Sequence, residues 1–293
     1  MNSIFDKEFF YTLNNISIRL NIKLSKGAQG GRKSKVRGTS VEFSDFREYV
    51  HGDDFRRVDW NTYGRFEKLF IKLFMEEREG NFSIFIDSSK SMDFGKFNKG
   101  DLALKIAAAL SYLGINNLDR VRIGILKEEG AEILKASRGK ESFLKIIKGL
   151  EDLEFSGRTN LKKSIIKSNF TSKGMTIIIS DFLIPDGEKD IENIVKYLTY
   201  KKQKVVFIQI LCEEEMNPEV VGTKNIIDVE TKEEVKVSIT PKIIKLYQEK
   251  IKEQEDMIRT ITRKYGGIFI KINSEEDIEK IILKDFFNHK LLG

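Results

Sequence analysis

The chain has 293 residues, of which 40% are hydrophobic and 33% charged, and its single cysteine excludes an internal disulfide. This length and this apolar content suit one large domain or a domain with an appendage, and they exclude a disordered or fibrous chain. No uncharged stretch reaches the roughly 20 residues that span a bilayer, and the net charge of +6 is too mild to indicate nucleic-acid binding by itself.

The first segment predicts an amphipathic helix followed by a basic stretch. Apolar residues recur at helical spacing from Asp6 to Leu20, and this face is expected to dock on the main domain. Asp6, Lys7 and Glu8 do not resemble the start of a signal peptide, so cytoplasmic residence is expected. From Arg19 to Arg37 seven basic residues occur without an acidic one. This field can attract phosphate, anionic lipid or an acidic partner, although a solvated arm is the simpler interpretation.

Charged and aromatic residues alternate densely between Gly31 and Trp60. Interleaved arginines and aspartates can pair through forked hydrogen bonds, and aromatic side chains supply the buried area that holds such pairs in place. The segment is therefore interpreted as an ordered lid on the main domain, and His51 as a turn residue rather than a base or ligand. Residues 1–80 are assigned to the N-terminal helix, the basic arm and this lid.

A buried strand delivers one aspartate and two serines into a loop. The continuous apolar run from Phe82 to Ile86 suits a strand that is covered on both faces. Asp87, Ser89 and Ser91 follow it at every second position. Their oxygens can turn towards one point, as a hard divalent cation requires. By itself this pattern is also typical of a helix-capping turn.

Two later segments offer ligands in matching surroundings. Thr159 lies at the start of a helical pattern, and a second apolar strand, Met175 to Ser180, ends in Asp181. If both strands are central in an α/β sheet, Asp87 and Asp181 lie together beyond their carboxyl ends, where such sheets bind ligands. Two carboxylates and three hydroxyls suit Mg²⁺, with Mn²⁺ or Ca²⁺ as alternatives, and leave at least one coordination position open.

The remaining elements alternate between helices and strands. Helices are expected over residues 99–113, 141–150, 160–169, 190–200, 241–265 and 275–287, and further strands over residues 120–126, 131–136, 204–211 and 268–272. The polar segment 213–240 predicts a protruding hairpin, with strands over residues 226–229 and 234–237. Cys212 before it is expected to be a buried, unreactive thiol. The alternation predicts a doubly wound, mostly parallel six-stranded α/β sheet of the Rossmann type over residues 81–293, with the N-terminal helix, the lid and the inserted hairpin as additions.

The five candidate ligands resemble the metal-ion-dependent adhesion site of von Willebrand factor A-type domains. They are Asp87, Ser89, Ser91, Thr159 and Asp181. A longer pattern, running from Gly31 to Trp60, is G-x-x-S-x-x-R-G-x-x-x-E-F-x-x-x-R-x-Y-x-x-G-D-D-x-R-x-x-D-W. With the segments around the five ligands, it resembles the bacterial family called domain of unknown function 58.

The resemblance implies more than the residues themselves show. In adhesion-type sites, it implies that a carboxylate of a partner protein fills the open metal position. Members of the family typically belong with a MoxR-type AAA+ ATPase, which implies an adaptor or co-chaperone that acts beside such an ATPase on a client protein. Many relatives also carry membrane helices, and this sequence departs from them because it contains no such stretch.

Two alternatives come from other functional classes. One is a metal-dependent hydrolase, in which the ion would activate water, but no obvious base accompanies the five ligands in the sequence, and no enzymatic activity is expected. The other is a nucleic-acid-binding protein that uses the basic arm with Tyr49 or Trp60. Its binding would weaken steeply with added salt and would not respond to chelation of metal ions.

Overall fold

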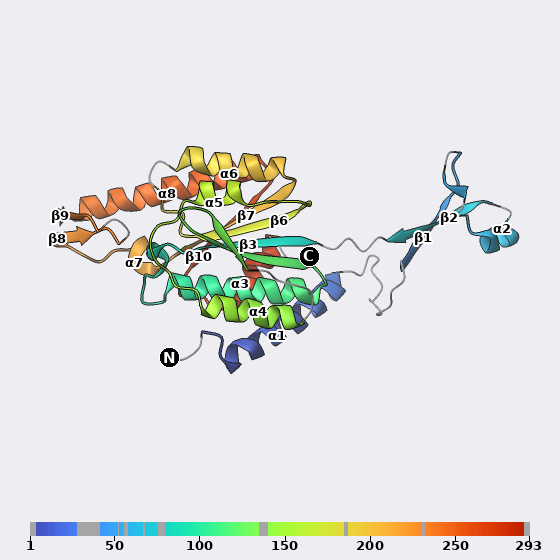
Figure 1. Ribbon diagram of the computed structural model, residues 1–293, viewed down its shortest axis with the longest axis horizontal. Coiled ribbons are helices and arrows are strands. Elements are labelled where there is room, and N and C mark those ends of the chain that lie inside the picture. Colours follow the sequence, from blue (N-terminus) through green and yellow to red (C-terminus); the bar gives the residue numbers. More distant parts are fainter. Residues whose placement is uncertain are drawn as a thin grey trace. The chain divides into compact units, whose positions relative to one another are not determined.

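The computed structural model describes residues 4–27, 42–51, 53–55, 58–66, 68–75, 80–134, 140–184, 187–229 and 232–289. The chain divides into two compact units, one formed by Met1–Gly27 with Gly80–Gly293 and the other by Ala28–Glu79 (Figure 1). Residues 28–41, which contain most of the basic stretch, lie outside the described residues. The predicted role of that stretch therefore stays a prediction.

The larger unit is built on a six-stranded sheet in the order β10-β7-β6-β3-β4-β5. The strands are β3 (Asn81–Asp87), β4 (Arg120–Leu126), β5 (Ala131–Leu134), β6 (Gly174–Ser180), β7 (Gln203–Leu211) and β10 (Ile268–Asn273). Neighbours are parallel except for β5, which pairs antiparallel with β4. The chain builds outward from β3 to β5 and then from β6 to β10, so the strand order switches between β3 and β6. The predicted doubly wound, mostly parallel six-stranded α/β sheet is confirmed.

Helices cover both faces of this sheet (Figure 1). One layer contains α1 (Lys7–Gly27), α3 (Lys99–Asn116), α4 (Lys140–Glu151) and α9 (Ile278–Lys280), and the other contains α5 (Leu161–Lys167), α6 (Glu188–Tyr200) and α8 (Pro241–Lys264). Leu13 and Ile16 of α1 belong to the same buried cluster as Ile106 of α3. Helix α3 lies between the sheet and its neighbours α1 and α4, which explains why it is apolar on nearly all sides.

Two predicted elements differ from those observed. The hairpin consists of β8 (Gly222–Ile227) and β9 (Glu234–Ile239), whereas the first strand was expected at 226–229. The first strand begins earlier than expected because polar residues pair across the strands there, as do the hydroxyls of Thr223 and Ser238 at 3.1 Å. This part of the strand has no apolar alternation that would predict it. The expected helix 275–287 begins only after Asp277, whose carboxylate caps α9, and it continues as a π-helix over Ile281–Phe286.

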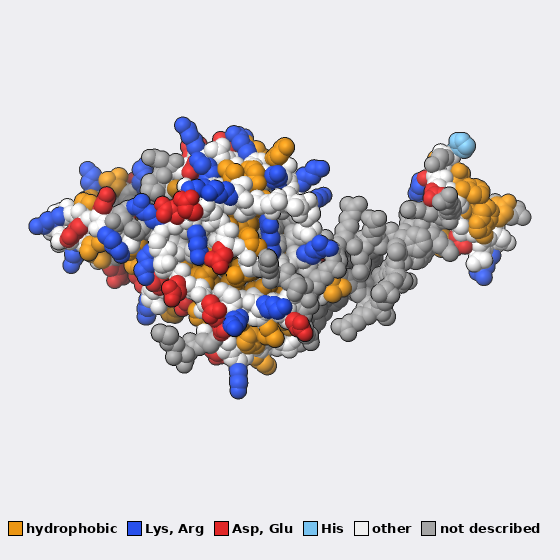
Figure 2. Space-filling model, viewed as in Figure 1, with side chains coloured by type: hydrophobic (Ala, Val, Ile, Leu, Met, Phe, Trp, Pro, Cys, Tyr) orange, Lys and Arg blue, Asp and Glu red, His pale blue; other side chains and the backbone are white. Residues whose placement is uncertain are grey.

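The smaller unit contains β1 (Glu42–Glu48), α2 (Trp60–Phe66) and β2 (Phe70–Met75), with β1 and β2 antiparallel. The alternation of charged and aromatic residues here pairs as expected. Arg47 donates to both carboxylate oxygens of Asp53 at 2.8 Å, and the rings of Phe55 and Trp60 meet edge to face at 5.3 Å. Both rings remain half exposed. Figure 2 shows a group of hydrophobic side chains on the surface of this unit.

Candidate metal site

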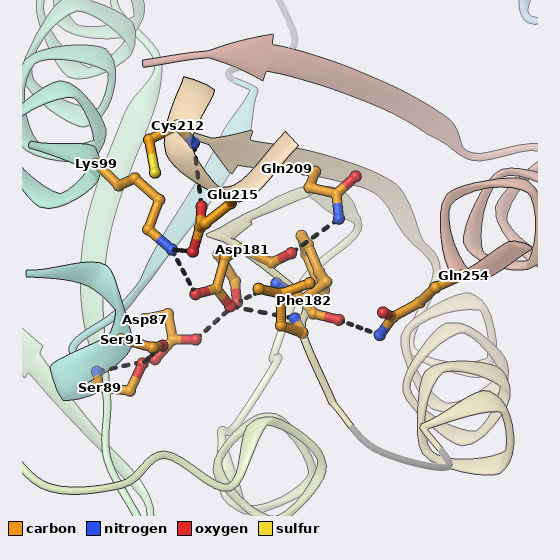
Figure 3. Close-up of polar contacts among 12 residues, drawn as sticks. Asp87, Ser89, Ser91, Lys99, Asp181, Phe182, Gln209, Cys212, Glu215 and Gln254 are labelled. Carbon is orange, nitrogen blue, oxygen red and sulfur yellow. Dashed lines mark hydrogen bonds and ion pairs between the residues drawn. The ribbon is translucent and has the colours of Figure 1, made fainter. Parts of the chain in front are cut away.

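Strand β3 ends in Asp87, and the loop after it gathers three oxygen-bearing side chains (Figure 3). The backbone N–H of Ser89 donates to Asp87 Oδ1 at 3.0 Å, and the hydroxyls of Ser89 and Ser91 lie 3.0 Å apart. Ser89 precedes a single 3₁₀ turn, Lys90–Met92, but its side chain makes no capping hydrogen bond within the described residues. The structure therefore does not support the helix-capping interpretation of this pattern.

Thr159 is brought to this loop by backbone hydrogen bonds between the two segments. Lys90 N donates to Gly157 O at 3.0 Å, and Ser156 N donates to the carbonyl of residue 88 at 2.9 Å. The Thr159 hydroxyl lies within hydrogen-bond reach of Leu126 O, at 3.2 Å, and of the Asp87 carboxylate, and its single proton can serve either acceptor. Helix α5 is capped by the next residue, which leaves the threonine side chain free to face the loop.

Asp181 follows β6 and is buried beside Asp87. Both side chains are nearly inaccessible, because each residue is only 4% exposed. Ser180 links the two strand ends: its hydroxyl donates to Asp87 Oδ2 at 2.6 Å and accepts a hydrogen bond from Phe182 N at 3.0 Å. The five residues predicted from the sequence are thus drawn from three separate segments to one point beyond the carboxyl ends of β3 and β6.

The turn after Asp181 has an unusual backbone conformation. Phe182 is buried and has a φ of 54°, in the left-handed region that bulky residues rarely occupy. Two glutamine side chains hold it there: Gln209 donates to Asp181 O at 2.8 Å, and Gln254 donates to Phe182 O at 2.6 Å (Figure 3). Strained backbone that is fixed by its surroundings is typical of functional sites, where it positions a side chain.

Two charged residues that the sequence analysis did not single out complete the surroundings. Lys99, the first residue of α3, is 0% exposed. Its ammonium lies 2.9 Å from Asp181 Oδ2 and 2.5 Å from Glu215 Oε1. One signal could have indicated it, because a lysine in the first turn of a helix is unfavourable next to the positive end of the helix dipole and therefore needs a specific partner.

The pKa shifts follow from this burial. Burial and then the charge of Asp181 raise the pKa of Asp87, against the hydrogen bonds from Ser180, Ser89 and Thr159. Burial alone would lower the pKa of Lys99, but the charges of Asp181 and Glu215 outweigh it and raise that pKa, so the ammonium stays protonated.

Cys212 is buried and its thiol is not reactive. Burial and then the nearby charge of Glu215 raise the pKa of Cys212 to about 12, so almost none of it is thiolate at neutral pH. Gly95 packs against it, since a Cβ on this glycine would lie 2.7 Å from Cys212 Cβ. Cys212 therefore packs against the loop that follows the candidate site.

The oxygen atoms at the site fit a hard divalent cation. Within the described part of the chain, no three His, Cys, Asp or Glu side chains are placed to hold one metal ion. The candidate site instead combines two buried carboxylates with hydroxyls, all oxygen donors of the kind that Mg²⁺, Mn²⁺ and Ca²⁺ bind. Two adjacent negative charges are costly to bury without a positive charge between them.

No helix in the described residues combines the length and the apolar character that crossing a membrane requires.

Uncharacterized proteins of Mycobacterium tuberculosis and Mycobacterium bovis are 29% identical to this chain over 189 residues, which are 61% of this chain and 59% of each relative. The chain thus spans about three fifths of the length of these curated relatives.

Solved structures of low sequence identity are also similar to the chain. BatB of Bacteroides thetaiotaomicron has a TM-score of 0.43 and 14% identity, over 72% of this chain and 99% of that chain. The SpRpn10 VWA domain has a TM-score of 0.43 and 11% identity, over 71% of this chain and 95% of that chain. The family described as "Protein of unknown function DUF58" matches residues 45–257, which is more than half of the sequence, and the chain belongs to this family, as the sequence pattern predicted.

Proposed function

We propose that the larger unit is a protein-interaction module that depends on a divalent cation, with Mg²⁺ as the first candidate. The proposed ligands are Asp87, Ser89, Ser91, Thr159 and Asp181. The observation that carries the proposal is the meeting of two buried carboxylates with hydroxyl side chains at the point where the strand order of the sheet switches. Open α/β sheets bind their ligands at this point.

The proposed ligands differ in their exposure. Asp87, Ser89 and Asp181 are buried, whereas Ser91 and Thr159 are half-buried, so solvent reaches these two hydroxyl residues. A cation bound here would offer a positive charge to an acidic side chain of another protein. The residues of this chain hold the oxygens in place, through the Ser180 bridge and the backbone hydrogen bonds between loops, so that little ordering is needed on binding.

We propose a role in binding rather than in catalysis. The amine nearest to the proposed ligands is Lys99, and its ammonium lies within 3 Å of two carboxylates that keep it protonated. A lysine in this state cannot accept a proton from water, which a metal-dependent hydrolase would require of a neighbouring base.

A MoxR-type AAA+ ATPase is the partner that we propose, with this chain as its adaptor or co-chaperone for a client protein. The family resemblance supports this partner, and the candidate site supports the mode of binding, in which a Glu or Asp side chain of the partner binds the cation. Cytoplasmic residence is part of the same proposal.

The test is affinity capture from native lysate by the full chain, in Mg²⁺ and in EDTA. We expect the ATPase to be captured in Mg²⁺ and to be lost in EDTA or with Asp87→Ala. Asp93→Asn is the matched control, because Asp93 also loses a negative charge close to the loop but pairs with Lys90 and Asn98 instead of facing the site. Circular dichroism of each variant shows whether it folds.

Two outcomes would contradict the proposal. Capture that survives both Asp87→Ala and chelation would remove the cation from the mechanism. Recovery of nucleic acid that ignores EDTA and declines steeply with salt would favour the basic arm as the binding element.

A further inference from the structure

A buried ammonium lies at the edge of the candidate metal site (Figure 3). Lys99 Nζ is enclosed between Asp181 Oδ2, at 2.9 Å, and Glu215 Oε1, at 2.5 Å. The ammonium thus contacts a proposed metal ligand directly, on the carboxylate oxygen Oδ2. The five-ligand set has no role for this lysine, although its ammonium contacts one member of the set.

Glu215 is held firmly in the position from which it pairs with Lys99. It belongs to α7 (Glu213–Met216), and its second carboxylate oxygen, Oε2, accepts a hydrogen bond from Cys212 N at 3.0 Å. The neighbouring Glu214 accepts one from Lys96 N at 2.9 Å, which ties α7 to the loop after the candidate site. Asp181 is anchored as well, because its other carboxylate oxygen, Oδ1, accepts a hydrogen bond from Leu183 N at 3.2 Å. The ammonium is therefore held between two fixed carboxylates.

The net negative charge at this point equals, in magnitude, the charge of one divalent cation. Asp87, Asp181 and Glu215 bring three negative charges to the site, and Lys99 removes one of them, which leaves two. We propose that Lys99 and Glu215 form a charge-balancing pair that sets the affinity of the site for divalent cations, with Lys99 weakening cation binding and Glu215 offsetting that effect.

This inference rests on the proposed metal site, and it makes a prediction that a purely structural role does not. If the pair only held the fold together, loss of either member would loosen the site and weaken cation binding in both cases. If the pair balances charge, removal of the ammonium should tighten cation binding, while removal of the Glu215 charge should weaken it. The two substitutions therefore move the affinity in opposite directions.

The experiment is calorimetric titration of the full, metal-free chain with Mn²⁺, checked by the electron paramagnetic resonance signal of free Mn²⁺. We expect Lys99→Met to bind Mn²⁺ about tenfold more tightly than the unaltered chain, and Glu215→Gln about tenfold more weakly, since a unit charge a few ångströms away contributes at least this much in a partly buried site. The double variant restores the net charge and should return the affinity close to its original value.

A matched control makes the same chemical change in an ion pair further from the site. Lys196 pairs with Glu192 at 3.1 Å in a partly exposed position along α6. Lys196→Met should leave the Mn²⁺ affinity unchanged. Urea unfolding of every variant without metal measures the stability cost separately from the affinity.

Each result decides the matter. Affinities that shift in the same direction, or do not shift, overturn the charge-balancing pair while leaving the metal site in place. If Lys99→Met does not fold, Glu215→Gln still tests the proposal, because its side chain keeps its shape and an unchanged affinity would overturn it. Absence of Mn²⁺ binding by the unaltered chain overturns the metal site itself and the pair with it.

Discussion

Both ends of the central sheet hold charged side chains that are partly or fully buried. These charges are stabilised by different kinds of partner at the two ends. At the carboxyl ends of β3 and β6, Asp87 and Asp181 are buried side by side, and an ammonium contacts Asp181. At the amino ends, Arg120 and Arg122 of β4 line a groove of about 490 Å³. The first end is acidic and closely packed, and the second is basic and open.

Arg122 shows how the basic end is satisfied without a counter-charge. Its guanidinium lies 4.7 Å from the ring centroid of Phe170 and donates to Ser83 Oγ at 2.9 Å and to Asn169 O at 2.7 Å. It forms no ion pair within the described part of the chain. A guanidinium is weakly hydrated and stacks well on rings, so neutral partners suffice.

This contrast separates buried charges with a structural role from those that indicate a binding site. The hydrogen bonds and the ring contact of Arg122 come from neutral groups around it. The aspartate pair is not stabilised in the same way, because burial and the charge of Asp181 raise the pKa of Asp87, and the ammonium that the described residues place here, Lys99, pairs with Asp181. We therefore expect a divalent cation to bind at the carboxyl end of the sheet and not at the amino end.

The largest expected effect is on cation affinity. Loss of an outer-shell partner typically weakens metal binding about 10- to 100-fold, so Asp87→Asn, which alters a proposed ligand, should weaken Mn²⁺ binding about 100-fold or more. Arg122→Met at the opposite end should leave it unchanged. Calorimetric titration of both variants measures this, and equal losses in the two would remove the contrast between the ends.

The next effect is on stability at the basic end. Arg122→Met removes the stacking on Phe170 and leaves the acceptors on Ser83 and Asn169 without their donor. We expect the free energy of unfolding to fall by about 1–3 kcal/mol. Urea unfolding without metal measures this loss, and a variant as stable as the unaltered chain would show that neutral partners contribute little here.

A smaller effect concerns the pH dependence of the acidic end. The pKa of Asp87 is raised by burial and by Asp181, so its ionised form costs folding free energy at neutral pH, and this cost is relieved as the pH falls through the raised pKa. Metal-free Asp87→Asn should therefore be more stable than the unaltered chain at neutral pH, and the advantage should shrink on acidification. Urea unfolding of both proteins across this range is the measurement, and an advantage that is constant with pH would argue against the shift.

The smallest effect belongs to an exposed charge pair. Lys162 and Asp190 are joined at 2.5 Å but are each more than a third exposed. Lys162→Met should change the free energy of unfolding by less than about 1 kcal/mol, because solvent screens exposed pairs. A larger loss in urea unfolding would show that the contrast between the two ends is not one of burial.

Much of the fold could be predicted because its signals are local. The apolar runs that became β3 and β6 each end in an aspartate, and the proline and glycines that flank α8 mark its ends. The hairpin and the last helix were less accurate, because polar cross-strand pairs and the Asp277 cap, rather than apolar periodicity, set their bounds. The elements β1, α2 and β2 were not predicted individually, since interleaved charges and rings have no clear period.

The sequence by itself predicted the strands of the central sheet and the five oxygen-bearing residues, whereas the order of the strands came from the tertiary structure. Only the tertiary structure decided that Lys99 and Glu215 join these five residues, because Lys99 is separated from Asp181 by 82 positions and from Glu215 by 116. A charge is stable in the interior only with partners close to it in space. Sequence patterns report periodicity and neighbours along the chain, whereas the free energy of a buried charge depends on neighbours that the fold brings together.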